Sequence, residues 1–173
     1  MASTSTSKQP MLVDRPFHEF VTVGGTTALT VSSDFTSIAS SGCVKLLDCT
    51  SNDGGVIDSI SIVANQSGTT AASVLVFLST ATAQQTITAA NTVCVASAAI
   101  ASSTAGERTN ISLPPLLVPV PNLGGTTSVS ELQKKNSGLY VPVGKLIYVG
   151  VSAAISAPSS ATRVHVFAQG GFY

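Results

Sequence analysis

The sequence is poor in the side chains on which catalysis and metal binding depend. Of its 173 residues only 9% are charged, against about 25% in a typical soluble domain. It has two His, three Cys and no Trp. This composition excludes a charged helical bundle or coiled coil. It also leaves few groups for acid–base chemistry or metal coordination, so we expect no catalytic residues, no cofactor, no metal site and no enzymatic activity.

The charges that are present balance. Eight Lys or Arg stand against eight Asp or Glu, so the chain lacks the basic patch typical of proteins that bind nucleic acid or anionic membranes. The longest uncharged apolar run, around residues 92–101, is far shorter than the roughly 20 residues that span a bilayer. The first ten residues lack the apolar core of a secretory signal. We therefore expect synthesis in the cytoplasm, with neither nucleic acid nor membrane as a partner.

The three cysteines, Cys43, Cys49 and Cys94, are an odd number in a chain expected to be made in a reducing compartment. This favours free, buried thiols that behave as small apolar residues. A bridge between Cys43 and Cys49, or between Cys94 and one of them, remains an alternative. The two histidines, His18 and His165, are isolated in the sequence, and a histidine in a strand-like run such as 164–167 is more typical of a sheet surface or a subunit contact.

Four oxygen-bearing residues of one loop, Asp48, Asn52, Asp53 and Asp58, are a weak candidate for Ca²⁺ binding. Their spacing is not that of an EF-hand. The run Asn-Asp-Gly-Gly at 52–55 is typical of a turn, and we interpret the segment as a turn.

A repeated pattern organises the rest of the chain. Short runs rich in Val, Ile and Thr are bounded by Gly, Asn, Asp or Ser, which is typical of an all-β protein. Nine such runs predict two antiparallel sheets packed as a jelly-roll-like or immunoglobulin-like sandwich. The predicted strands are residues 20–23, 28–32, 44–49, 56–65, 72–79, 92–98, 109–113, 145–153 and 163–168.

Two pairs of consecutive strands are predicted to form antiparallel hairpins. The first joins 56–65 to 72–79 through Asn-Gln-Ser-Gly at 65–68, because Asn and Gly accept the positive φ of tight turns. The second joins 145–153 to 163–168. Within the first pair, the run Val-Leu-Val-Phe-Leu at 74–78 is apolar on both faces, which indicates a central strand covered on both sides.

Two segments interrupt the strand pattern. Residues 113–121 hold four of the eight prolines, and since proline lacks an N–H this segment predicts an extended edge or an interface strap. Ser128 and Glu131 have capping-box spacing, which predicts a short helix at about 129–136, and a second short helix is expected at 35–40. We expect a flexible N-terminal arm over residues 1–19 and one sandwich domain over 20–173.

Three stretches resemble the small all-β accessory proteins of tailed bacteriophage virions, in particular head decoration or cement proteins. They are IDSISIVANQSGTTAASVLVFLSTA (57–81), VPVGKLIYVGVSAAI (141–155) and RVHVFAQGGFY (163–173). The resemblance implies a non-enzymatic structural protein of the virion that binds the major capsid protein or another virion protein, stabilises the shell and forms a homotrimer. The alternative is a phage fibre or another domain that binds a receptor or glycan.

The sequence places the contact surface in two segments. The proline-rich strap offers apolar side chains, and the C-terminus offers aromatic anchors after Gly170-Gly171, which we expect to be flexible. The predicted interface residues are Leu116, Leu117, Val118, Phe167, Phe172 and Tyr173.

Overall fold

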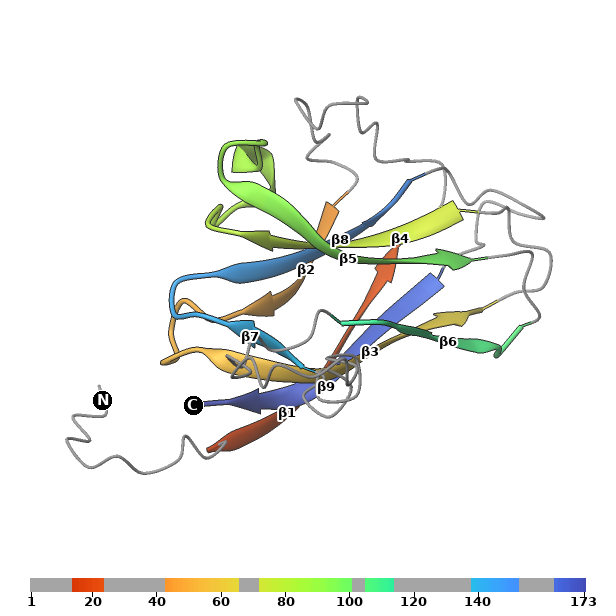
Figure 1. Cartoon of the computed structure of the whole chain (residues 1–173), viewed down its shortest axis with the longest axis horizontal. Coiled ribbons are helices and arrows are strands. Elements are labelled where there is room, and N and C mark those ends of the chain that lie inside the picture. The colour runs from red at the N-terminus through yellow and green to blue at the C-terminus, as the bar shows by residue number, and fades with distance from the viewer. Residues whose placement is uncertain (1–13, 24–42, 66–71, 101–104, 114–137, 153–163) are drawn as a thin grey trace, which may run out of the picture.

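Two antiparallel β-sheets packed against each other make up the part of the chain that the structure describes (Figure 1). The computed structural model describes residues 14–23, 43–65, 72–100, 105–113, 138–152 and 164–173. In the described residues, no helix is both long enough and apolar enough to cross a membrane.

The first sheet has five strands in the order β1-β9-β3-β6, with β7 also paired to β3. The second sheet has four strands in the order β2-β8-β4-β5. A short 3-10 turn, η2, lies between β4 and β5. The bounds are β1 (Arg15–Val23), β2 (Cys43–Asp48), β3 (Gly55–Ala64), β4 (Ala72–Ser79), η2 (Gln84–Thr86), β5 (Thr92–Ile100), β6 (Arg108–Ile111), β7 (Leu139–Val141), β8 (Leu146–Val151) and β9 (Val164–Phe172).

The strand pairing is nested along the chain. β1 pairs with β9, β2 with β8, β3 with both β6 and β7, and β4 with β5. This is a ribbon of antiparallel strands that has been rolled up, so that β9 also meets β3 and β8 also meets β4. Nested pairing across two sheets is jelly-roll connectivity. Of the two sandwich types expected from the sequence, the chain therefore forms the jelly roll.

Both predicted hairpins are wrong. β3 and β4 lie in different sheets, as do β8 and β9. The physical reason is that each of the central strands β3, β4, β8 and β9 is already flanked on both sides by other strands of its own sheet. No side of these strands is therefore left for the partner that either predicted hairpin requires. The prediction that residues 74–78 lie in a central, doubly covered strand is confirmed, since Val76 and Phe77 point to opposite faces and both are fully buried.

The predicted start of the domain at residue 20 is too late. β1 begins at Arg15, and residues 15–19 pair in register with residues 172–168 of β9. Arg15, His18 and Glu19 are compatible with a strand there because β1 is an edge strand and their side chains are exposed. The short strand β7 was not predicted. Residues 1–13 of the expected arm, the strand at 28–32, both short helices and the strap from residue 114 onward lie outside the described residues.

The main core lies between the two sheets. Its members are the inward-facing aliphatic side chains of both layers, among them Ile57, Ile60 and Ile62 of β3 and Val74 and Val76 of β4. Alternation along each strand sends the intervening side chains to the outer faces. A binding site on the broad face of either sheet must therefore be built from those outer positions.

Candidate protein-binding face

A row of aromatic side chains lies on the outer face of the first sheet, across β1 and β9. Phe20 is directly opposite Phe167, and Thr22 is opposite His165. His18 is two residues from Phe20 along β1 and so lies on the same face. We call His18, Phe20, His165 and Phe167 the aromatic row.

Ring contacts hold the aromatic row together diagonally. The rings of His18 and Phe167 meet edge to face at 5.6 Å between centroids, and those of Phe20 and His165 at 6.4 Å. Such T-shaped pairs are the favoured aromatic geometry. The His165 ring is further oriented by a hydrogen bond of 3.1 Å between its Nδ1 and Thr22 Oγ1. The row is thus pre-formed, although Phe20 itself is 64% exposed.

A second aromatic pair lies on the same face where β7 meets the C-terminus. The rings of Tyr140 and Tyr173 are 6.2 Å apart between centroids. Tyr173 is anchored because its backbone N–H donates to Gly54 O at 3.1 Å. Burial, followed by the nearby Tyr140 and Asp58, raises the pKa of Tyr173.

A polar cluster lies on the same outer face, across the central strand β3 and the edge strand β6. The Ser61 hydroxyl donates to Asn110 Oδ1 at 2.9 Å and accepts from Arg108 Nε at 3.0 Å and Nη2 at 2.7 Å. The Arg108 guanidinium is therefore held against the sheet. Since Ser61 is also directly opposite Phe167, the aromatic row and the polar cluster adjoin on one continuous face.

The predicted interface residues fall in different environments. Phe167 belongs to the aromatic row, and Tyr173 lies on the same outer face. Phe172 instead packs on the core, with its ring 4.8 Å from that of Phe17 and the Arg15 guanidinium 5.8 Å from the ring centroid. Leu116, Leu117 and Val118 lie outside the described residues.

The expectation of a flexible Gly170-Gly171 connection is wrong. Both glycines are part of β9 and pair with β1 on one side and β3 on the other. A Cβ at Gly170 would collide with the backbone oxygen of Val56 and would lie 2.9 Å from the Phe17 ring. These glycines let two strands approach closely and do not form a hinge, so removing residues 170–173 would remove part of the first sheet.

Sequence reasoning missed His18, Phe20 and Tyr140 as members of this face. The signal was present in Pro-Phe-His-Glu-Phe at 16–20, where Phe17 and Phe20 are three residues apart and fall on opposite faces of an extended chain. Placing the start of order after residue 19 hid this alternation. Phe17 is indeed buried while Phe20 is exposed.

The cysteines do not form a reactive site. All three are free, Cys43 and Cys49 are buried and Cys94 is half-buried. Burial raises the pKa of Cys43 to about 12, and burial together with the charge of Asp48 raises that of Cys49 to about 11. Because the thiolate is the nucleophile and the metal ligand, neutral thiols of this kind are poor candidates for either role.

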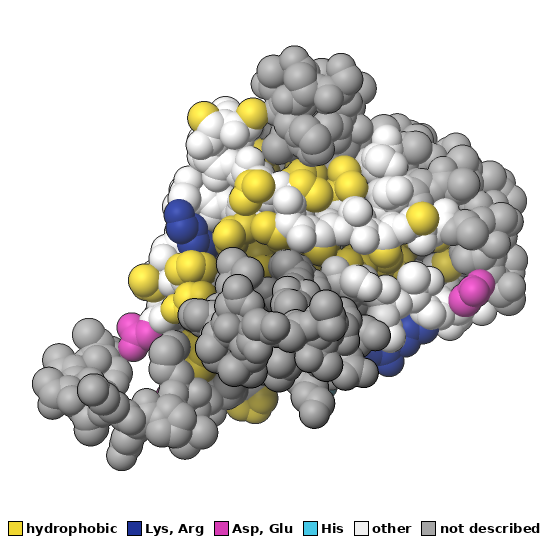
Figure 2. All heavy atoms as spheres, in the orientation of Figure 1, with side chains coloured by type: hydrophobic (Ala, Val, Ile, Leu, Met, Phe, Trp, Pro, Cys, Tyr) yellow, Lys and Arg dark blue, Asp and Glu magenta, His cyan; other side chains and the backbone are white. Residues whose placement is uncertain are grey.

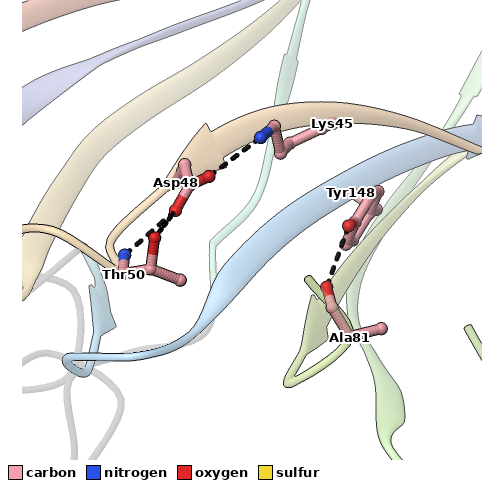
Figure 3. Close-up of polar contacts among 5 residues, drawn as sticks. All are labelled: Lys45, Asp48, Thr50, Ala81 and Tyr148. Atoms are coloured by element: carbon pink, nitrogen blue, oxygen red, sulfur yellow. Dashed lines mark hydrogen bonds and ion pairs between the residues drawn. The ribbon is translucent and has the colours of Figure 1, made fainter. Parts of the chain in front are cut away.

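Asp48 and Asn52, two of the loop residues considered for Ca²⁺ binding, already form hydrogen bonds to other groups of the protein. Lys45 Nζ donates to Asp48 Oδ2 at 2.8 Å, and the N–H and hydroxyl of Thr50 donate to Asp48 Oδ1 at 3.0 and 2.6 Å (Figure 3). Burial raises the pKa of Asp48, but these hydrogen bonds outweigh it and lower the value to about 2. Asn52 Oδ1 accepts a hydrogen bond from Arg15. In the described part of the chain, no three His, Cys, Asp or Glu side chains cluster as metal ligands would.

An open cavity of about 300 Å³ lies between the β4–β5 connection and Lys145. Its polar groups are used to hold that connection in place. Ser79 Oγ and Thr92 Oγ1 are hydrogen-bonded at 2.7 Å, and the Asn91 amide donates to Thr86 O at 2.8 Å. The cavity therefore offers little specific chemistry to a ligand, and the outer face of the first sheet is the stronger candidate site.

Neither the protein-family models, nor the curated proteins, nor the solved structures include a match to this chain.

Proposed function

We propose that the chain is a non-enzymatic structural protein of a viral particle, of the decoration or cement type. It binds the major capsid protein or another virion protein through the outer face of its first sheet. The observation that carries the proposal is the pre-formed aromatic row. Its member Phe20 is 64% exposed and is not part of the core.

Aromatic side chains provide most of the contact energy where proteins associate, and they do so best when already fixed in position. The aromatic row meets this condition, because its rings contact each other and His165 is held by Thr22. A sheet face also moves little on binding, so the geometry of the free protein resembles that of the complex. A broad, rigid face with an exposed aromatic side chain suits attachment to a large protein surface.

Attachment of this kind stabilises a shell by mass action. A protein that binds the assembled shell better than its separate subunits shifts the equilibrium toward the assembled state. No catalytic step is needed, which agrees with the scarcity of ionisable side chains in the sequence. On this proposal the protein is located in the virion after synthesis in the host cytoplasm.

The test compares two variants that each remove one exposed apolar side chain. Phe20→Ser removes the centre of the aromatic row, and Val143→Ser removes a side chain that is 60% exposed in the turn between β7 and β8. Particles of the source virus stripped of this protein are incubated with each variant, and bound copies per particle and the temperature of shell disruption are measured. Phe20→Ser should lose binding and protection, whereas Val143→Ser should retain both. Equal binding by both variants would place the contact elsewhere.

The Tyr140–Tyr173 pair favours a second candidate, a receptor-binding or glycan-binding domain. Tyr140 is 40% exposed, and Asp58 lies close enough to Tyr173 to raise its pKa. Aromatic faces beside a carboxylate are suited to sugar rings and their hydroxyls. Binding to a glycan array that disappears in Tyr140→Ala and persists in Phe20→Ser would favour this function over shell attachment.

A further inference from the structure

The two sheets end in strands that differ in how well their free edges are protected against pairing with another strand. In the described part of the chain, β1, β6 and β7 border the first sheet, and β2 and β5 border the second. Soluble proteins protect such edges with charges, prolines, bulges or short strands, because the unpaired N–H and C=O groups bind any extended chain.

Four of the five edge strands carry such protection. β1 contains Pro16 and the exposed Glu19, and β2 has a bulge after Lys45 within only six residues. β6 and β7 have four and three residues, and β6 includes Arg108.

The edge strand β5 lacks most of these devices. It has nine residues, TVCVASAAI, with no charge and no proline. Its pairing to β4 has one register shift, near Val95, and residues 96–100 pair without interruption. Ser97 and Ala99 are exposed on the outer face of the second sheet. In Figure 1, β5 lies in front of the other strands of its layer, and Figure 2 shows hydrophobic side chains along the same side of the molecule.

We propose that β5 is a self-association edge, which pairs antiparallel with β5 of a second copy of this chain. The unpaired N–H and C=O groups of an edge strand match those of another extended strand, which can add to the sheet. Because β5 has no charged side chain, pairing with its own copy brings no like charges together. It also offers no charge by which to select a charged foreign strand. The small side chains around Ser97 allow two copies to approach across a twofold axis.

This arrangement determines the symmetry of the assembly. Pairing of a strand with itself is isologous and closes as a dimer, which joins two four-stranded sheets into one of eight strands. The homotrimer implied by the family resemblance is not formed by this contact. The proposal is independent of shell attachment, because the aromatic row lies on the other sheet.

The test inserts charge at the centre of the edge. Ser97→Lys and Ser97→Glu each place like charges near each other across the twofold axis, and each should raise the dimer dissociation constant at least about tenfold in sedimentation velocity. An equimolar mixture of the two variants should form the dimer again, because the charges are then opposite. Ser112→Lys, at an exposed site just beyond β6, is the matched control and should leave the dimer unchanged.

Three outcomes would overturn the proposal. The first is a wild-type protein that is monomeric at about 100 μM, a concentration well above micromolar dissociation constants. The second is a wild-type trimer. The third is a dimer that withstands both Ser97 variants. Thermal unfolding of each variant, which should match that of the wild type, separates a lost contact from a lost fold. A dimer broken by Phe20→Ser and not by Ser97→Lys would assign self-association to the aromatic row instead.

Discussion

The outer faces of the two sheets are used in opposite ways. Part of the outer face of the second sheet is covered by the chain itself, and the side chains there form a second core that includes Phe77, Leu146 and Tyr148. The outer face of the first sheet presents Phe20 and Tyr140 to solvent. Phe77 and Phe20 are both outward-facing phenylalanines, yet one is fully buried and the other is 64% exposed.

The cover of the second sheet is the connection between β4 and β5. Ala81 and Ile87 from this connection pack on Phe77, Leu146 and Tyr148, and the Tyr148 hydroxyl donates to Ala81 O at 2.9 Å (Figure 3). Apolar residues on an outer face thus have two explanations in one molecule. Where the chain covers them they stabilise the fold, and where they remain exposed they contribute little to stability and are free to serve binding.

The largest expected effect is a difference in stability between variants of these two phenylalanines. Phe77→Ala should lower the free energy of unfolding by about 3–5 kcal/mol, because it leaves a cavity in the second core. Phe20→Ala should change it by no more than about 0.5 kcal/mol, as is usual for exposed positions. Urea denaturation followed by circular dichroism measures both. Similar losses for the two variants would show that the aromatic row is also part of the folded core.

A smaller loss in the free energy of unfolding is expected from Gly170→Ala. This variant tests how closely β9 packs against β3 in the first sheet. The added methyl group meets the Val56 carbonyl and the Phe17 ring, so β9 must shift away from β3 at a cost of about 1–3 kcal/mol. Gln169→Ala, one residue earlier in the same strand, serves as the control and should have little effect. A Gly170→Ala protein as stable as the wild type would mean that the C-terminal end of β9 is not packed against β3 in solution.

Tyr148→Phe tests the hydrogen bond between the second sheet and its cover. The variant leaves Ala81 O without its partner, and the free energy of unfolding should fall by about 1 kcal/mol. Tyr140→Phe, on the open face, should be close to neutral. Thermal unfolding of the two variants gives the comparison, and equal midpoints would show that the cover does not depend on this hydrogen bond.

Thiol labelling tests the same contrast without a change in stability. Cys43 lies on the outer face of the second sheet but is fully buried, and burial raises its pKa to about 12. It should react slowly with a disulfide reagent at pH 8, whereas the thiol of His18→Cys on the open face should react at the rate of an exposed thiol. Between pH 7 and 9 the rate for Cys43 should rise about tenfold per pH unit, because this range lies well below its pKa, whereas the rate for the second thiol should start higher and level off as the pH passes an ordinary thiol pKa of about 8.5. Rapid labelling of Cys43 in the folded protein would mean that the cover opens readily.

Local patterns in the sequence were sufficient for several elements and misleading for others. The bounds of β4 were predicted as they occur, because a run of apolar residues ending in polar ones marks a buried strand directly. The start of β1 was missed because Arg15, His18 and Glu19 resemble a loop unless the exposed side of an edge strand is known. The two hairpins failed because turn residues reverse the chain without specifying which sheet the next strand joins.

Composition and periodicity by themselves determined the all-β class, the two-sheet architecture and the scarcity of groups for chemistry, since strand-forming runs and missing side chains are local properties. The tertiary structure decided the rest. Phe20 and Phe167 are 147 positions apart in the chain and become neighbours only when β9 pairs with β1. The side chains of Phe20 and Phe77 have the same chemistry, so only the placement of the β4–β5 connection over one outer face determines which of them is buried.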